Sequence, residues 1–118
     1  MLNKLLVRIN NINELSYLKE KGINNFLFPL DGFSIGYNTF KIDEIKGLDV
    51  NIYLLVNRVF DNDTLNNWNN IKEKLTFVKG IFFEDIAVYM TTKNIPLIWN
   101  TSHAVISTNS INYWLSLV

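Results

Sequence analysis

The sequence of 118 residues contains no cysteine. Disulfides, zinc sites built from thiolates and cysteine-bound iron–sulfur clusters are therefore excluded within this chain. The sequence also lacks an excess of charge of either sign, since eleven Lys and Arg residues balance eleven Asp and Glu residues. A neutral chain offers no electrostatic footprint for nucleic acid or for a membrane surface.

Long apolar runs are absent as well. No stretch approaches the ~18 residues that a membrane span requires, and the start, MLNKLLVRINN, lacks the long apolar core of a signal peptide. We therefore expect a cytoplasmic protein. The length predicts one domain that is large enough to bury a hydrophobic core.

Five short apolar runs predict strands, and each is followed by residues at helical spacing. The strands are expected at residues 5–9, 26–30, 51–56, 81–83 and 97–100. The clearest amphipathic helix places Leu65, Trp68, Ile71 and Leu75 on one stripe. Other helices are expected around residues 15–18 and over 39–48, 86–93 and 109–118. In the last of these, Trp114 falls on the apolar stripe.

Strands that are apolar on both faces and alternate with helices are typical of an α/β fold with a parallel sheet. Right-handed connections leave two architectures, a barrel and a doubly wound sheet. A doubly wound nucleotide binder carries a glycine-rich turn after its first strand, whereas RINNINE has no glycine. We predict five successive β-α units of a partial (β/α) TIM-type barrel, with residues 1–118 as a single domain cut short after the fifth unit. An open doubly wound parallel sheet is the alternative.

Both architectures bind ligands at the carboxyl ends of their strands. Polar residues follow each predicted strand there: Asn10, Asp31, Asn57, Arg58, Glu84, Asp85, Asn100 and His103.

The catalytic candidates are Glu84, Asp85 and His103. A carboxylate would activate water, or bind a metal that does so, and His103 would carry the proton. Strand alternation puts Glu84 and Asp85 on different faces, so at most one of them points toward a ligand and the other caps the following helix. The structural alternative is that one of the two acids caps a helix and the other is solvated, and that His103 is an ordinary loop residue.

The substrate-binding candidates are Asn57, Arg58 and Asn100. The planar guanidinium of Arg58 suits a carboxylate or a phosphate, although a surface pair with Asp61 or Asp63 is equally compatible with the sequence. Asn57 either holds substrate or ties down a loop. The sequence predicts no particular metal or cofactor, and it has no phosphate loop, paired-histidine zinc helix or serine nucleophile elbow.

The order of several short segments resembles the first half of the collagenase-like peptidase family. The matching segments are Val56-Asn57, Phe83-Glu84-Asp85-Ile86-Ala87-Val88, Asn100-Thr101 and Asn112-Tyr113-Trp114. The resemblance covers nearly the whole chain and implies a barrel. Members of the family are linked to degradation of collagen-like proteins, and relatives to hydroxylation of RNA bases and of quinones. The family's downstream glutamate, glycine and paired cysteines are absent here.

The resemblance implies a peptidase-like partial barrel that hydrolyses peptides or that is incomplete and inactive alone. The first alternative is a non-catalytic module that assembles through its open sheet edges, either with a second copy or with a partner chain that completes the barrel. The second alternative is a small-ligand binder.

Overall fold

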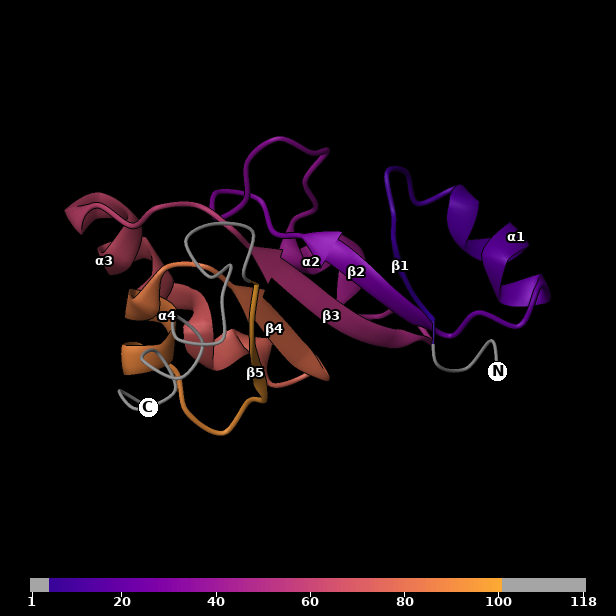
Figure 1. The fold of residues 1–118 in the computed structure, drawn as a ribbon. Helices are drawn as coiled ribbons and strands as arrows, with labels where there is room; N and C mark the ends of the chain where they lie inside the picture. The colour runs from indigo at the N-terminus through magenta and orange to yellow at the C-terminus, as the bar shows by residue number, and fades with distance from the viewer. Residues whose placement is uncertain (1–4, 101–118) are drawn as a thin grey trace, which may run out of the picture.

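The computed structural model describes residues 5–100, and Figure 1 shows their arrangement. The strands are β1 (Leu6–Arg8), β2 (Asn25–Pro29), β3 (Asn51–Val56), β4 (Gly80–Phe83) and β5 (Leu97–Trp99). The helices are α1 (Glu14–Glu20), α2 (Ile42–Ile45), α3 (Asn62–Ile71), the 3-10 helix η2 (Lys72–Leu75) and α4 (Ile86–Thr91). The predicted alternation is confirmed for these elements, while the helix predicted over 109–118 lies outside the described residues. No helix of residues 5–100 is long and apolar enough to cross a membrane.

The helix predicted over residues 39–48 is much shorter in the structure. Phe40 pairs with the end of β2 and so is not helical. Its N–H donates to the carbonyl of Pro29 at 2.9 Å, and its carbonyl accepts the N–H of Asp31. Only the four residues of α2 are helical. Its first turn is stabilised by Glu44, which accepts the backbone N–H of Lys41 at 2.9 Å.

The five strands form one parallel sheet in the order β1-β2-β3-β4-β5. Each strand therefore lies beside its neighbours in sequence, from β1 at one edge to β5 at the other (Figure 1). The predicted α/β class and parallel sheet are confirmed. The order contains no reversal of direction across the sheet.

One face of this sheet forms the hydrophobic core. Register places Phe28 beside Leu54, and Leu54 beside Ile81, so these side chains share a face. All three are fully buried. They belong to a single cluster with residues from each of the four α-helices: Leu15, Ile45, Trp68 and Val88. The helices therefore cover this face.

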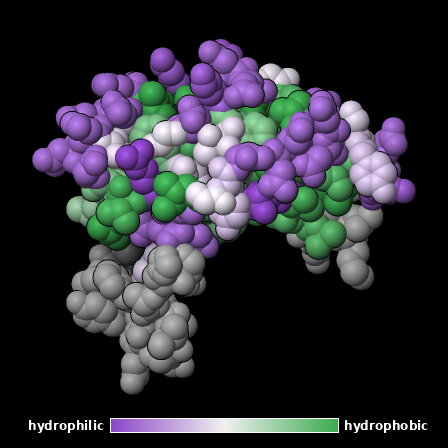
Figure 2. Space-filling view, turned by 90° about the horizontal axis from the view of Figure 1, so that it is seen from above, coloured by the Kyte–Doolittle hydropathy of each residue, from purple (hydrophilic) through white to green (hydrophobic). Residues whose placement is uncertain are grey.

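The opposite face of the sheet carries apolar residues that stay outside this cluster. We call it the open face, and its apolar residues are Leu27, Tyr53, Leu55, Phe82 and Ile98. Arg8, Asn25 and Asn51 lie on the same face by register. Leu55 is buried, but the other four apolar side chains are partly exposed. Seen from above, the described residues form an arch that is hydrophilic along its convex side, and hydrophobic residues border its hollow side (Figure 2).

Aromatic packing organises the open face. A Cβ atom at Gly80 would lie 3.2 Å from the Tyr53 ring and 3.3 Å from Ile98. The absence of a side chain at Gly80 thus lets the Tyr53 ring lie across β4. The same ring meets Phe82 edge-on, with centroids 6.3 Å apart.

Trp68 anchors α3 to the rest of the fold. It is 0% exposed, and its ring meets Phe33 and Phe60 with centroids 5.2 and 5.9 Å apart. Its indole N–H donates to the hydroxyl of the buried Thr92 at 3.0 Å. The hydrogen bond satisfies two polar groups that would otherwise be buried without a partner.

We predict that Trp68→Phe lowers the free energy of unfolding by about 2–3 kcal/mol, because it leaves a cavity and deprives Thr92 of its donor. Urea unfolding measures the change. The matched control is Tyr17→Phe, which alters a ring that is 62% exposed and should change stability by less than about 0.5 kcal/mol. Equal effects of the two substitutions would contradict this role of Trp68.

Candidate functional site

Two of the predicted site residues meet at the carboxyl edge of the sheet. Val56, Phe83 and Trp99 are the last residues of β3, β4 and β5 and are partners in register. The residues that follow them, Asn57, Glu84 and Asn100, therefore start from the same level of the sheet. Asn100 donates its side-chain N–H to Glu84 Oε2 at 2.9 Å. Strand alternation places both side chains on the same side as the open face.

Asp85, which follows Glu84 at this edge, caps α4. Its Oδ1 accepts the N–H of Ala87 at 2.9 Å, and its Oδ2 accepts the N–H of Phe60 at 2.7 Å. Alternation predicts different faces for the two acids, and their side chains have separate partners, Asn100 for Glu84 and two backbone N–H groups for Asp85. Asp85 therefore fits the helix-cap alternative: it satisfies the first turn of α4 and fixes the loop that follows β3.

Asn57 ties down the loop between β2 and α2. Its Oδ1 accepts the hydroxyl of Ser34 and the N–H of Ile35, each at 2.8 Å. Its Nδ2 donates to the carbonyl of Ile35 at 3.2 Å. Of the two alternatives for this residue, holding a substrate or holding a loop, the geometry matches the second.

Arg58 contacts the same loop. Its Nη1 donates to the carbonyl of Gly32 at 3.1 Å, and its backbone N–H donates to the carbonyl of Phe33 at 3.2 Å. No ion pair of Arg58 within 4 Å occurs among residues 5–100. Asp61 instead caps α3, and the N–H of Thr64, 2.8 Å away, lowers the pKa of Asp61, with the charge of Arg58 acting in the same direction.

The third catalytic candidate, His103, lies outside the described residues. Within residues 5–100, no three His, Cys, Asp or Glu side chains gather in a group that could hold a metal ion.

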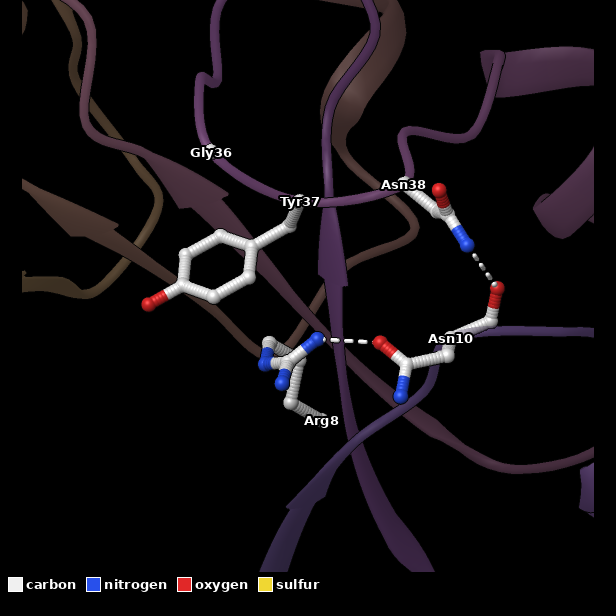
Figure 3. Close-up of a pocket in the computed structure, with 5 residues that line it drawn as sticks. All are labelled: Arg8, Asn10, Gly36, Tyr37 and Asn38. Atoms are coloured by element: carbon white, nitrogen blue, oxygen red, sulfur yellow. Dashed lines mark hydrogen bonds between the residues drawn. The ribbon is translucent and has the colours of Figure 1, made fainter.

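An open pocket of about 680 Å³ lies beside β1, and we call it the Arg8 pocket. The pocket is lined by Arg8, Asn10, Gly36, Tyr37 and Asn38. Sequence reasoning singled out Asn10 at this strand end but missed Arg8 and the loop residues. The Arg8 guanidinium lies under the Tyr37 ring, 4.2 Å from its centroid, and donates to the side chain of Asn10 (Figure 3). A signal was present in the sequence, since Arg8 is the only charged residue of the apolar run 5–9.

Comparison of the chain with protein-family models, with curated proteins and with solved structures gave no match. The resemblance to collagenase-like peptidases therefore stays a prediction.

We predict that Asp85→Ala lowers the free energy of unfolding by about 2 kcal/mol, because it removes a helix cap and leaves the N–H of Phe60 without its acceptor. Chemical denaturation measures the loss. Asp49→Ala is the control, since it removes an exposed loop carboxylate and should change stability by less than about 0.5 kcal/mol. If Asp85→Ala were as stable as the control, the assignment of Asp85 as a structural cap would be wrong.

Proposed function

We propose that this chain is a non-catalytic assembly module, a partial barrel that is completed by a second copy of the same chain. The observation that carries the proposal is the open face, an apolar sheet surface that no helix of residues 5–100 covers. Four of its five side chains stay partly exposed within the described fold, and an apolar sheet face that is incompletely covered is a common place for an interaction.

The strand order supports the partial barrel. When right-handed connections always move in one direction across a sheet, every helix falls on the same face. A doubly wound sheet reverses direction and places helices on both faces. Here the order is sequential and the four α-helices share one core cluster, which is the arrangement that the outer ring of a barrel requires.

The two edges of the sheet are complementary to each other. All described strands point the same way, so a two-fold rotation about an axis along the strands would bring β5 of one copy beside β1 of the other, in parallel. Such a pairing gives a closed sheet without free strand edges, because the same contact between β5 of one copy and β1 of the other occurs twice. Two five-stranded sheets would give ten strands in all.

The side chains of the open face suit such an enclosed space. The interior of a barrel widens as strands are added, so a ten-stranded barrel needs large residues to fill it. Tyr53 and Phe82 lie at the centre of the sheet, on β3 and β4. The formal net charge of +0 adds no repulsion between two copies.

Peptide hydrolysis, which the family resemblance implies, stays a prediction. Its acid–base chemistry would combine Glu84 with His103, and His103 lies outside the described residues. Asp85 is bound to the backbone of two other segments. The open face is the observation that supports assembly.

We predict that the full chain has a solution mass of twice the 13.8 kDa of one chain, measured by light scattering on a sizing column. Phe82→Glu should shift the equilibrium to monomer, because it buries a charge in the contact between copies. The control is Met90→Glu, which places the same charge on α4 at a residue that is 69% exposed and should leave the mass unchanged.

A folded monomer of the unchanged sequence would contradict this proposal. It would assign the cover of the open face to residues 101–118 or to a different protein. A dimer that Met90→Glu and Phe82→Glu weaken equally would also contradict it, because the contact would then not involve the open face.

A further inference from the structure

We propose that the Arg8 pocket binds the oxyanion group, a carboxylate or a phosphate, of a small molecule. This goes beyond the assembly role, because every residue that lines the pocket comes from one chain. The pocket lies at the carboxyl end of β1, the side of a parallel sheet where α/β proteins bind their ligands.

The first argument is that Arg8 stands out from its surroundings. Its partners in register are Leu27 on β2 and, next to it, Tyr53 on β3. Arg8 is thus the one charged residue of β1, and it lies at the edge of the sheet on the same face as Leu27 and Tyr53. A permanently charged group in that position needs either a counter-ion or solvent.

The second argument is that no carboxylate of the described chain neutralises this charge. The one ion pair within residues 5–100 joins Lys46 to Asp43. Glu14 is close to Arg8 in sequence, but its Oε1 accepts the backbone N–H groups of Asn10 and Asn11 at 3.1 and 2.8 Å. The guanidinium therefore presents its remaining donors without an acidic partner from this part of the chain.

The third argument is that the guanidinium is held in place. Tyr37 stacks on its face at 4.2 Å, and the Oδ1 of Asn10 accepts one of its N–H groups. The side-chain amide of Asn38 in turn donates to the backbone carbonyl of Asn10 at 3.2 Å. Figure 3 shows these groups converging around the pocket. A planar guanidinium that is fixed before binding loses little entropy when it forms a two-pronged contact with an oxyanion.

The fourth argument concerns the loop that carries Tyr37. Gly36 has a φ of 83°, a left-handed conformation that glycine adopts without strain. The loop is anchored on one side by Asn57 at Ser34 and Ile35. At its base the hydroxyl of Thr39 donates to Asp31 at 3.0 Å. Asn57 is therefore a positioning residue for the pocket, although it does not line it.

The test is a titration of the full, ¹⁵N-labelled chain with sodium phosphate and, separately, with sodium acetate. Sodium chloride at equal ionic strength is the solvent control. We expect saturable shifts of the Arg8 Nε–H signal and of the Asn10 and Asn38 side-chain amides with at least one of the two oxyanions. Tighter binding of phosphate would indicate a phosphorylated ligand, and tighter binding of acetate a carboxylate ligand.

Three variants make the assignment specific. Arg8→Gln should weaken binding by at least about tenfold, since it removes the charged fork. Tyr37→Leu should weaken it by about threefold or more through loss of the stacked ring. Lys93→Gln removes the same charge from an exposed residue that precedes β5, at the other end of the sheet, and should leave binding unchanged.

Equal shifts with chloride, no saturation with either oxyanion, or equal weakening by Arg8→Gln and Lys93→Gln would each overturn the proposal. A monomeric protein that still binds phosphate or acetate at Arg8 would contradict the assembly proposal and support the proposed oxyanion site. A dimer that binds neither oxyanion would support the assembly proposal and contradict the oxyanion site.

Discussion

The structure depends on one constraint, which is that helices cover only one of the two apolar faces of the parallel sheet. Each strand turns its side chains alternately to the two faces, and the connections deliver every helix to the same side. Phe28, Leu54 and Ile81 are thereby buried under the helices. Tyr53 and Phe82, one residue away from Leu54 and Ile81, are left partly exposed on the open face. The proposed second copy would cover these two partly exposed rings.

The same alternation explains why polar residues at the strand ends have such different roles. The side chains of Asp85 and Asn57 form hydrogen bonds with backbone groups of neighbouring segments. These contacts stabilise the carboxyl edge of the sheet, where connecting segments would otherwise be mobile. The loop that Asn57 fixes carries Tyr37, which orients Arg8. Asn57, a substrate-binding candidate in the sequence, thus bonds to the loop that carries Tyr37.

The sequence predicted the strands well, because short apolar runs bounded by polar residues leave few alternatives, and each observed strand begins and ends within one residue of its predicted range. It predicted α2 poorly, because Phe40 is held by β2 through hydrogen bonds that no local pattern reveals. The pairing of Glu84 with Asn100 depends on register across sixteen residues of sequence. The Arg8 pocket depends on a loop folding back over β1, and the sequence shows the isolated charge of Arg8 but not this long-range contact.

The most direct test of the central claim is the distance between spin labels in mixed samples. Because the chain has no cysteine, Leu6→Cys on β1 and Pro96→Cys beside β5 would provide unique labelling sites. If a second copy closes the open face, β5 of one chain lies next to β1 of the other, about 5 Å away for neighbouring strands. The account predicts that the intermolecular distance between Leu6→Cys and Pro96→Cys chains is shorter than that between two Leu6→Cys chains. No intermolecular coupling, or the shortest distance between two Leu6→Cys chains, would contradict it.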